Sequence, residues 1–447
     1  MSKLNVLNAP ETILLVDDHY LAASRNVQRT FHAPEKRPEN PILCTGQVDW
    51  EIVPLIFGSV LYDPNVKKYR MWYASYGPSV ADEDIHYWAK LRTADSDDGL
   101  HWQRRKRIVF ESTPEDRYIE IGAVLIERDR YVLVATMIER TEQKRRVYRL
   151  AYSNDGLRWN RGGEIPYQKP GHVDRHCLLK DPATGEYLFY FRGIELVPKK
   201  YPTVDFCIRT VCFQSSRDLE HWSDTKLVMA ADKSDPPYTN IYSLMPFFRG
   251  QTLMGVYQLH YQHRHEEVVT THLAWSHDRT TWHRRHEEFI PLGAPGQWDR
   301  FNNAVASGPL IIGDTMYFYY SGRLYRHGGY EPKSKPDTGQ YWSGIGVATM
   351  KLDRFASLAA SFDAGTFTTK PMLWPKGKDL RLNADCRWGS IEIEMHTPGR
   401  KKPIKQTRVE GVEGVRLATG LKFPATETPV RLTFKLTNAR IYALSNQ

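Results

Sequence analysis

A short motif recurs four times in this chain, and its spacing limits what the chain can fold into. The copies read SDDGLHW, SNDGLRW, SRDLEHW and SHDRTTW, and their serines stand at positions 96, 153, 216 and 276. Successive copies are about 60 residues apart, a period typical of repeat architectures such as propellers. The motif is therefore evidence about the fold before it is evidence about function.

A segment with the pattern of a β-hairpin accompanies each repeat. A strand ends in a polar turn, often with Asp and Gly, and a strand rich in Tyr, Phe, Trp and Val returns. The motif then leads from a third strand to a fourth. Four short antiparallel strands per repeat, five times over, predict an all-β protein built on a five-bladed β-propeller. The five hairpin segments are 61–77, 126–139, 180–193, 247–261 and 311–323.

The repeat pattern changes toward the end of the chain. The fifth repeat carries residues 343–358 in place of the motif, and shorter strand-like stretches follow. These stretches predict a small C-terminal β-sandwich at 365–447, packed on the propeller. The propeller, expected to be the catalytic domain, is predicted to span 46–364, and residues 1–45 are expected to form an extension that packs on it.

Composition narrows the function classes. Hydrophobic residues make up 41% of the 447 and charged residues 25%, which is typical of a folded soluble protein. The net charge is +9, but the densest basic runs, 143–149 and 399–405, lie in no recognisable nucleic-acid module, so no nucleic-acid partner is expected. No apolar run approaches the ~20 residues of a membrane helix, so no membrane partner is expected. With no signal peptide evident, the chain is predicted to be cytoplasmic as written, or periplasmic or secreted if a leader was removed.

No metal or cofactor is predicted. The five cysteines include no CxxC pair, so neither a zinc site nor a disulfide framework is indicated. Residues 260–267, HYQHRHEE, hold three histidines and two glutamates. A solvated charged loop at a hairpin end is a better interpretation of this run than a metal site.

The aspartates of the repeated motif have two interpretations. They could act in catalysis, or they could stabilise a turn in which Ser and Asp side chains accept backbone N–H groups, Gly supplies a positive φ and Trp packs between blades. A motif that occurs once per blade cannot mark a single active site. The structural interpretation is favoured, and the chemistry is expected where the blades differ.

The segments that differ are those predicted to form the innermost strand of each blade. Polar residues cluster at the starts of these strands, which face one mouth of the central channel. Carboxylates that converge there with Arg, His and aromatic residues would form a plausible hydrolytic centre. The five segments are 46–60, 115–126, 171–181, 236–247 and 296–310.

Cleavage of a glycosidic bond needs two carboxyl groups, and a neighbouring charge can separate their pKa values. The candidate catalytic residues are Asp49, Glu51, Glu120 and Asp174. The candidate substrate-binding residues are Trp50, Arg175, His176, Arg192, Tyr242, Asp299, Arg300, Asn302 and Arg323.

Each carboxylate also has a structural alternative. Asp49 or Glu51 could cap a loop before a strand. Strand alternation sets Glu120 either toward the channel or toward Arg117. Asp299 fits a positioning or structural role as well as a catalytic one. Arg192 and Arg323 end second strands, where a salt bridge between blades is an alternative to binding a substrate anion.

Together these features resemble the five-bladed propeller glycoside hydrolases of families 32, 43 and 68 and the related mannoside phosphorylases of family 130. The likeness is greatest to uncharacterised bacterial proteins described as similar to the N-terminal domain of family 32. The likeness rests on four stretches of the sequence: LLVDDHYL, a Trp-Glu pair before YDPNVKKYRMWY, a Trp-Asp near the last blade, and ARIYAL close to the end. It covers nearly the whole chain.

The resemblance implies hydrolysis by acids at the starts of the inner strands of blades one to three. Carried over by position, these are Asp49 or Glu51, then Glu120, then Asp174. The family 32 motifs Trp-x-Asn-Asp-Pro-Asn, Arg-Asp-Pro and Glu-Cys are absent, so fructan specificity is not implied.

Three functions remain open at this point, each with a carbohydrate partner. The first is a glycoside hydrolase acting on an oligo- or polysaccharide. The second is a phosphorylase in which an arginine or histidine, such as Arg175, His176, Arg192 or Arg300, would hold phosphate. The third is a non-catalytic carbohydrate-binding propeller.

Overall fold

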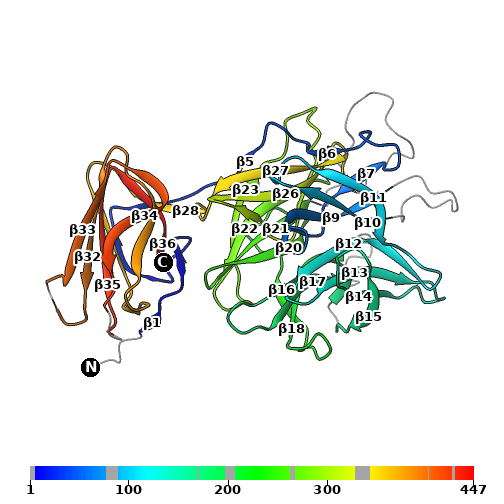
Figure 1. Cartoon of the computed structure of the whole chain (residues 1–447), viewed down its shortest axis with the longest axis horizontal. Helices are drawn as coiled ribbons and strands as arrows, with labels where there is room; N and C mark the ends of the chain where they lie inside the picture. Colours follow the sequence, from blue (N-terminus) through cyan, green and yellow to red (C-terminus); the bar gives the residue numbers. More distant parts are fainter. Residues whose placement is uncertain are drawn as a thin grey trace.

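The computed structural model describes residues 6–76, 89–168, 171–196, 207–261, 267–327, 343–400, 402–424 and 428–446. At 119–121, 171–172, 195–196 and 207 it describes the backbone but not the side chains. The described residues form strands, turns and loops and no helix, so the all-β prediction is confirmed. Figure 1 shows the strands gathered into two parts.

Three sheets follow one another along the chain, each an antiparallel meander in sequence order. The first contains β7 (Val53–Leu55), β8 (Val60–Asp63), β9 (Lys68–Tyr76), β10 (Ala89–Ser96) and β11 (Gln103–Phe110). The second contains β12 (Asp116–Ile126), β13 (Tyr131–Glu139), β14 (Arg146–Ser153) and β15 (Asn160–Ile165). The third contains β16 (Gly171–Lys180), β17 (Tyr187–Leu196), β18 (Cys207–Ser216) and β19 (Lys226–Met229).

A ten-stranded sheet follows, and it divides into two units. A single parallel pair, Val269 with Asn302, joins the units. The first unit is β20 (Thr239–Arg249), β21 (Thr252–Tyr261), β22 (Val269–Ser276) and β23 (His283–Ile290). The second is β24 (Asn302–Val305), β25 (Leu310–Ile312), β26 (Thr315–Arg323) and β27 (Ser343–Lys351), with β5 (Glu35–Lys36) and β6 (Leu43–Cys44) beside β27.

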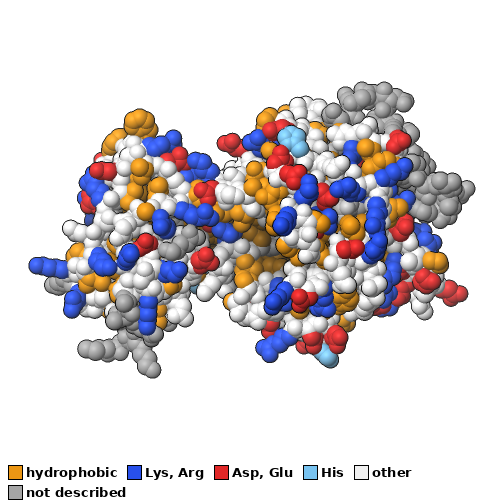
Figure 2. Space-filling model, in the orientation of Figure 1, with side chains coloured by type: hydrophobic (Ala, Val, Ile, Leu, Met, Phe, Trp, Pro, Cys, Tyr) orange, Lys and Arg blue, Asp and Glu red, His pale blue; other side chains and the backbone are white. Residues whose placement is uncertain are grey.

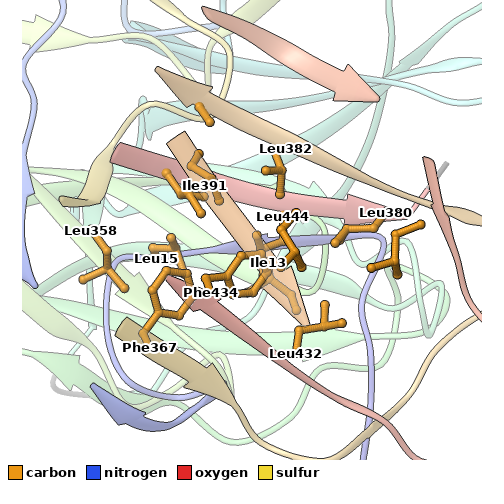
Figure 3. Close-up of a cluster of buried hydrophobic side chains, with 14 of the residues drawn as sticks. Ile13, Leu15, Leu358, Phe367, Leu380, Leu382, Ile391, Leu432, Phe434 and Leu444 are labelled. Atoms are coloured by element: carbon orange, nitrogen blue, oxygen red, sulfur yellow. The ribbon is translucent and has the colours of Figure 1, made fainter. Parts of the chain in front are cut away.

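Eleven further strands form two sheets that share one hydrophobic core, part of which is shown in Figure 3. Phe367 and Phe434 stack within this core with ring centroids 4.6 Å apart. One sheet contains β2 (Thr12–Leu14), β4 (Gln28–Phe31), β28 (Ala356–Ala360), β31 (Asp379–Asp385), β34 (Glu413–Lys422) and β36 (Ala439–Asn446). The other contains β3 (Leu21–Arg25), β29 (Gly365–Thr369), β32 (Ser390–His396), β33 (Lys405–Glu410) and β35 (Arg431–Thr437). A short pair joins β1 (Leu7–Asn8) to β30 (Met372–Leu373).

The N-terminal segment does more than the sequence predicts. Its strands β1 to β4 pair with strands of the C-terminal part, and β5 and β6 pair with β27. Asp17 also accepts a hydrogen bond from Trp275 of β22 (2.7 Å) and contacts His277 in the turn after β22 (2.9 Å). The segment therefore links the two parts. The predicted domain boundaries stay a prediction.

The repeated motif forms the same turn in all four copies. In the first, Asp98 Oδ1 accepts the backbone N–H groups of Leu100 and His101, both at 2.8 Å, and Ser96 Oγ accepts that of Gly99 at 2.8 Å. The turns at Asp155, Asp218 and Asp278 repeat these bonds. The structural interpretation of the motif is confirmed, because its carboxylates are held by the backbone.

The fourth residue of each turn has a left-handed backbone, with φ between 69° and 77°. Glycine takes this conformation without strain, and two of the four copies use it. In three turns its carbonyl accepts a hydrogen bond from an aromatic side chain of another sheet unit: Gly99 from Tyr319 (2.6 Å), Gly156 from Trp72 (2.9 Å) and Arg279 from Tyr190 (2.7 Å). The turns thus connect neighbouring units.

Replacing Asp155 with alanine is expected to lower the free energy of unfolding by about 1–2 kcal/mol, because two backbone N–H groups lose their acceptor. Denaturant unfolding would measure this change. Asn154→Ala, at the adjacent exposed position, is the matched control and is expected to be near neutral. Equal stability of the two variants would contradict the role given to the motif.

The distribution of charge on the surface does not point to a particular partner. Figure 2 shows Lys and Arg side chains scattered over both parts of the visible face and not collected in one stripe. Within the described ranges, no helix has the length and apolar character needed to cross a membrane.

Candidate functional site

Two of the strands predicted to be innermost are β16 and β20, the first strands of their sheet units. Polar residues near the starts of these two strands lie close together. Asp174 and Arg175 lie near the start of β16, Tyr242 near the start of β20, and Arg192 toward the end of β17. Contacts between their side chains define one group, here called the Asp174 cluster. Four residues predicted from the sequence therefore lie in a single place.

An ion pair between Asp174 and Arg192 is at the centre of the Asp174 cluster. Arg192 is 3% exposed, and it also donates to the backbone carbonyl of Tyr242 from Nη2 at 2.7 Å and Nε at 3.2 Å. Burial opposes the charge on Arg192, but Asp174 together with Tyr242 and Tyr148 outweighs burial and raises the arginine's pKa. The Asp174 side chain keeps 23% of its surface exposed, so its carboxylate is held yet accessible.

Arg175 contacts aromatic rings from two other sheets. The Arg175 guanidinium carbon lies 3.3 Å from the ring centroid of Phe57, between β7 and β8 of the first sheet, and 5.3 Å from that of Tyr242. The Arg192 guanidinium carbon lies 4.2 Å from the same tyrosine ring. Tyr242 is thus contacted by both arginines, an arrangement favoured by the negative face of an aromatic ring.

Three further residues complete the cluster; none was a candidate from the sequence, although His260 belongs to the 260–267 run that was weighed as a metal site. His327 Nε2 contacts the Tyr242 hydroxyl at 2.8 Å, and the rings of His260 and His327 have centroids 4.2 Å apart. Arg209 Nη1 lies 3.1 Å from His260 Nδ1. These residues come from different strands and loops, so no spacing in the sequence reveals their proximity.

Burial, with Arg209 and Arg192 nearby, lowers the pKa of His260 to about 3. Burial also lowers the pKa of His272, in β22 and outside the cluster, to about 4. In the unfolded chain both histidines would take up a proton near pH 6.5, whereas in the folded protein they stay neutral. Stability is therefore fully present above pH 6.5 and is lost as the pH falls toward the folded-state values.

Between pH 7 and pH 5 each histidine is expected to cost about 2 kcal/mol of unfolding free energy. Urea unfolding at the two pH values would measure the loss. His260→Gln and His272→Gln should each remove part of the pH dependence, the second without changing the cluster. A wild-type stability that is flat over this interval would contradict the assigned protonation states.

Glu51 lies in a second group, just before β7 of the first sheet. It is 1% exposed and pairs with Arg104, whose Nη1 lies 2.6 Å from Glu51 Oε2. Burial raises the pKa of the neighbouring Tyr73 hydroxyl far above its usual range, with the Glu51 charge as a further cause. Trp50 packs against arginines in the same group, with the guanidinium carbons of Arg92 and Arg104 at 4.5 and 5.9 Å from its ring.

The two other catalytic candidates have different surroundings. Asp49 is exposed in the turn before β7, and no described contact holds it. Glu120 lies in β12, where the pairing with β13 shifts between Tyr118 and Gly122. The Glu120 side chain lies outside the described residues, so its predicted role stays a prediction.

Asp299 is buried, and its Oδ2 binds Lys36 Nζ at 2.5 Å and accepts the Tyr320 hydroxyl at 3.0 Å. These contacts fit the structural alternative for Asp299. Arg300 reaches the carbonyl of Gly293 at 3.5 Å. Among the described contacts, none joins these residues to the Asp174 cluster.

Asn302 and Arg323 lie opposite each other on β24 and β26, and Asn302 is buried. His176 is enclosed between the second and third sheets, with Nε2 2.9 Å from the carbonyl of Val134 and Nδ1 3.0 Å from that of Asp174. Burial lowers the pKa of His176. This placement favours a packing role for His176 over the predicted contact with substrate.

Among the described residues, no group of three His, Cys, Asp or Glu side chains could hold a metal ion. Two histidines of the 260–267 run, at positions 263 and 265, lie outside the described residues.

Comparisons with known proteins agree with this architecture. No family model and no curated protein matches the chain. Solved structures do match with TM-scores of 0.50: a glycoside hydrolase (14% identity, covering 72% of this chain and 94% of that one) and a glycosyl hydrolase from Bacteroides ovatus (16%, 72% and 94%). A β-1,2-mannobiose phosphorylase from Listeria innocua, solved with β-1,2-mannobiose, matches at the same score (14%, 71% and 96%). The predicted resemblance is confirmed as a likeness of fold: the chain has the all-β, propeller-type fold of these glycoside-active proteins.

Proposed function

We propose that this chain is an enzyme that cleaves a glycosidic bond in an oligo- or polysaccharide, with the Asp174 cluster as its active site. The proposed architecture is a five-bladed propeller followed by a C-terminal β-sandwich. Five units support the blade count: the first three sheets and the two halves of the ten-stranded sheet. The common core of the last two sheets supports the sandwich.

The observation that carries the proposal is the Asp174–Arg192 pair. Asp174 is a carboxylate that remains partly exposed and is held in place by a buried arginine. Arg192 favours the ionised form of its partner. Asp174 is therefore suited to activate water or to attack the anomeric carbon, which are the roles of a carboxylate in glycoside hydrolysis.

Hydrolysis needs a second carboxyl group to protonate the leaving oxygen. Glu51, Glu120 and Asp49 are the candidates, all from the first two sheets of the propeller. Whether the product keeps its anomeric configuration depends on the separation of the two carboxyl groups, about 5 Å for retention and about 6.5–9.5 Å for inversion.

Phosphorolysis is the second candidate, and the charges of the cluster favour it. The described cluster combines one carboxylate with Arg175, Arg192 and Arg209. Arginine binds phosphate through bidentate, charge-assisted hydrogen bonds. A phosphorylase would need one acid and a bound phosphate in place of a second carboxylate and water.

The test is a panel of oligo- and polysaccharides incubated with the protein with and without inorganic phosphate. Release of free sugar without phosphate supports hydrolysis, and phosphate-dependent release of a sugar phosphate supports the phosphorylase. Sugar binding without turnover, unchanged by loss of Asp174, would instead support the non-catalytic binding propeller.

A further inference from the structure

We propose that a basic groove beside the Asp174 cluster binds an anionic group of the glycan, a carboxylate or a sulfate, so that the substrate is an acidic glycan. This inference rests on the proposed function. The groove measures about 590 Å³, within the ~300–1,000 Å³ range of small-molecule sites. It is lined by Arg117, Ile138, Glu139, Arg140, Thr141, Lys144 and Arg146.

The register of the second sheet places two of these cations in one row. Ile138 of β13 pairs with Arg117 of β12 on one side and with Arg146 of β14 on the other. Residues directly opposite in antiparallel strands point to the same face. With strands spaced about 4.8 Å apart, the two arginine backbones lie roughly 10 Å from each other across Ile138.

The two arginines lie on the same face of the second sheet as the residues that contact Asp174. On β13 and β14, the cross-strand pair two residues away from Ile138 and Arg146 is Thr136 with Tyr148. Thr136 Oγ1 donates to the backbone carbonyl of Asp174 at 3.2 Å, and the Tyr148 hydroxyl accepts its backbone N–H at 3.1 Å. Two residues of a strand span about 7 Å. The pair of Arg117 and Arg146 across Ile138 therefore lies about this distance along the sheet from the residues that contact the backbone of Asp174.

The charge of the lining residues fixes the kind of ligand. Four of the seven are cations, and the one carboxylate, Glu139, is bound by Arg145 from Nη2 at 2.8 Å and Nε at 3.0 Å. The groove thus presents positive charge to a ligand beside the reactive carboxylate. Arginines recognise carboxylate and sulfate oxygens through paired, charge-assisted hydrogen bonds.

The residues that line the groove also favour an acidic glycan over single-stranded nucleic acid as the ligand. Proteins that bind single strands offer aromatic side chains on which bases stack. None of the seven residues that line this groove is aromatic. Together with the position next to Asp174, this favours an acidic sugar as the ligand.

The experiment measures binding by calorimetry to four probes: oligogalacturonate, sulfated galacto-oligosaccharide, neutral galacto-oligosaccharide of the same length, and an oligo-dT strand. Arg117→Gln and Arg146→Gln are each expected to weaken binding of an acidic probe about tenfold, because a charge-assisted hydrogen bond is lost. Arg140→Gln with Lys144→Gln tests the same groove at two exposed positions. Binding should also weaken as salt is raised.

Arg158→Gln is the matched control, because it removes one exposed arginine from the opposite end of the same sheet. Arg408→Gln, in β33, extends the control to the other part of the chain. Both should bind acidic probes like the wild type, and thermal unfolding would confirm that all variants fold.

Tighter binding of either acidic probe than of the neutral one, lost in the groove variants and kept in the controls, would support the inference; the better acidic probe identifies carboxylate or sulfate. Equal binding of acidic and neutral probes, or groove variants that bind like the wild type, would overturn it. Tightest binding of oligo-dT, with the same arginine dependence, would also overturn it. Arginine-dependent acidic binding with no turnover of any glycan would refute the proposed function alone, whereas turnover of neutral glycans only would refute the inference alone.

Discussion

Replacing Asp174 with asparagine is expected to lower kcat by a factor of about 10²–10⁴, the usual contribution of a positioned acid or base. Asparagine keeps the shape of the side chain and its ability to contact Arg192, but it cannot exchange a proton or attack an anomeric carbon. The measurement is the initial rate on the best substrate of the glycan panel.

Asp174→Asn also leaves Arg192 buried beside a neutral group, so part of any lost activity could come from lost stability. Unfolding of the variant must therefore be measured together with its rate. Arg192→Lys is the companion variant: it keeps the charge but loses the two bonds to the Tyr242 carbonyl. A folded Asp174→Asn protein with wild-type kcat would show that the reaction takes place elsewhere.

Replacing Arg104 with methionine is expected to destabilise the protein by about 3–5 kcal/mol, because it leaves the buried Glu51 carboxylate without its partner. Both side chains are nearly inaccessible, at 7% and 0% exposure. The double variant Arg104→Met, Glu51→Gln removes both charges and should recover much of the loss. Denaturant unfolding of the two single variants and the double variant would give the coupling between them.

The same variants separate the two roles considered for Glu51. If Glu51 is the second carboxyl group of the reaction, the stabilised double variant stays inactive. If its role is structural, activity returns with stability. Equal stability of Arg104→Met and the wild type would contradict the buried ion pair itself.

The repeats were predictable because their information is local. The Ser-x-Asp turn fixes its own backbone within a few residues, as the bonds of Asp98 and Asp155 show. Alternating aromatic residues then define the strands on either side. Sheet order follows from the short connections between consecutive strands.

The part played by the N-terminal segment was not predictable in the same way. Strand β2 pairs with β36, more than 400 residues later in the chain. A pairing of this length leaves no period or turn signal in the sequence. The link between Asp17 and Trp275 spans 258 residues and leaves no such signal either.

The site was predictable in part. Asp174, Arg175 and Arg192 stand out because they interrupt strands that are otherwise apolar, and the structure places them together. His327 and Arg209 follow no such pattern, since their proximity to Tyr242 and His260 depends on how sheets meet. The partner of Glu51 was missed for the same reason, because Arg104 lies on β11, far along the sheet from the inner strand.

The most direct test of the central claim is the crystal structure of Asp174→Asn with the best substrate of the panel bound. The account predicts an intact sugar at the Asp174 cluster, with its scissile bond within about 3 Å of the side chain at position 174 and in contact with Arg192 or Tyr242. A sugar bound only outside the Asp174 cluster, in a variant that has lost activity, would contradict it.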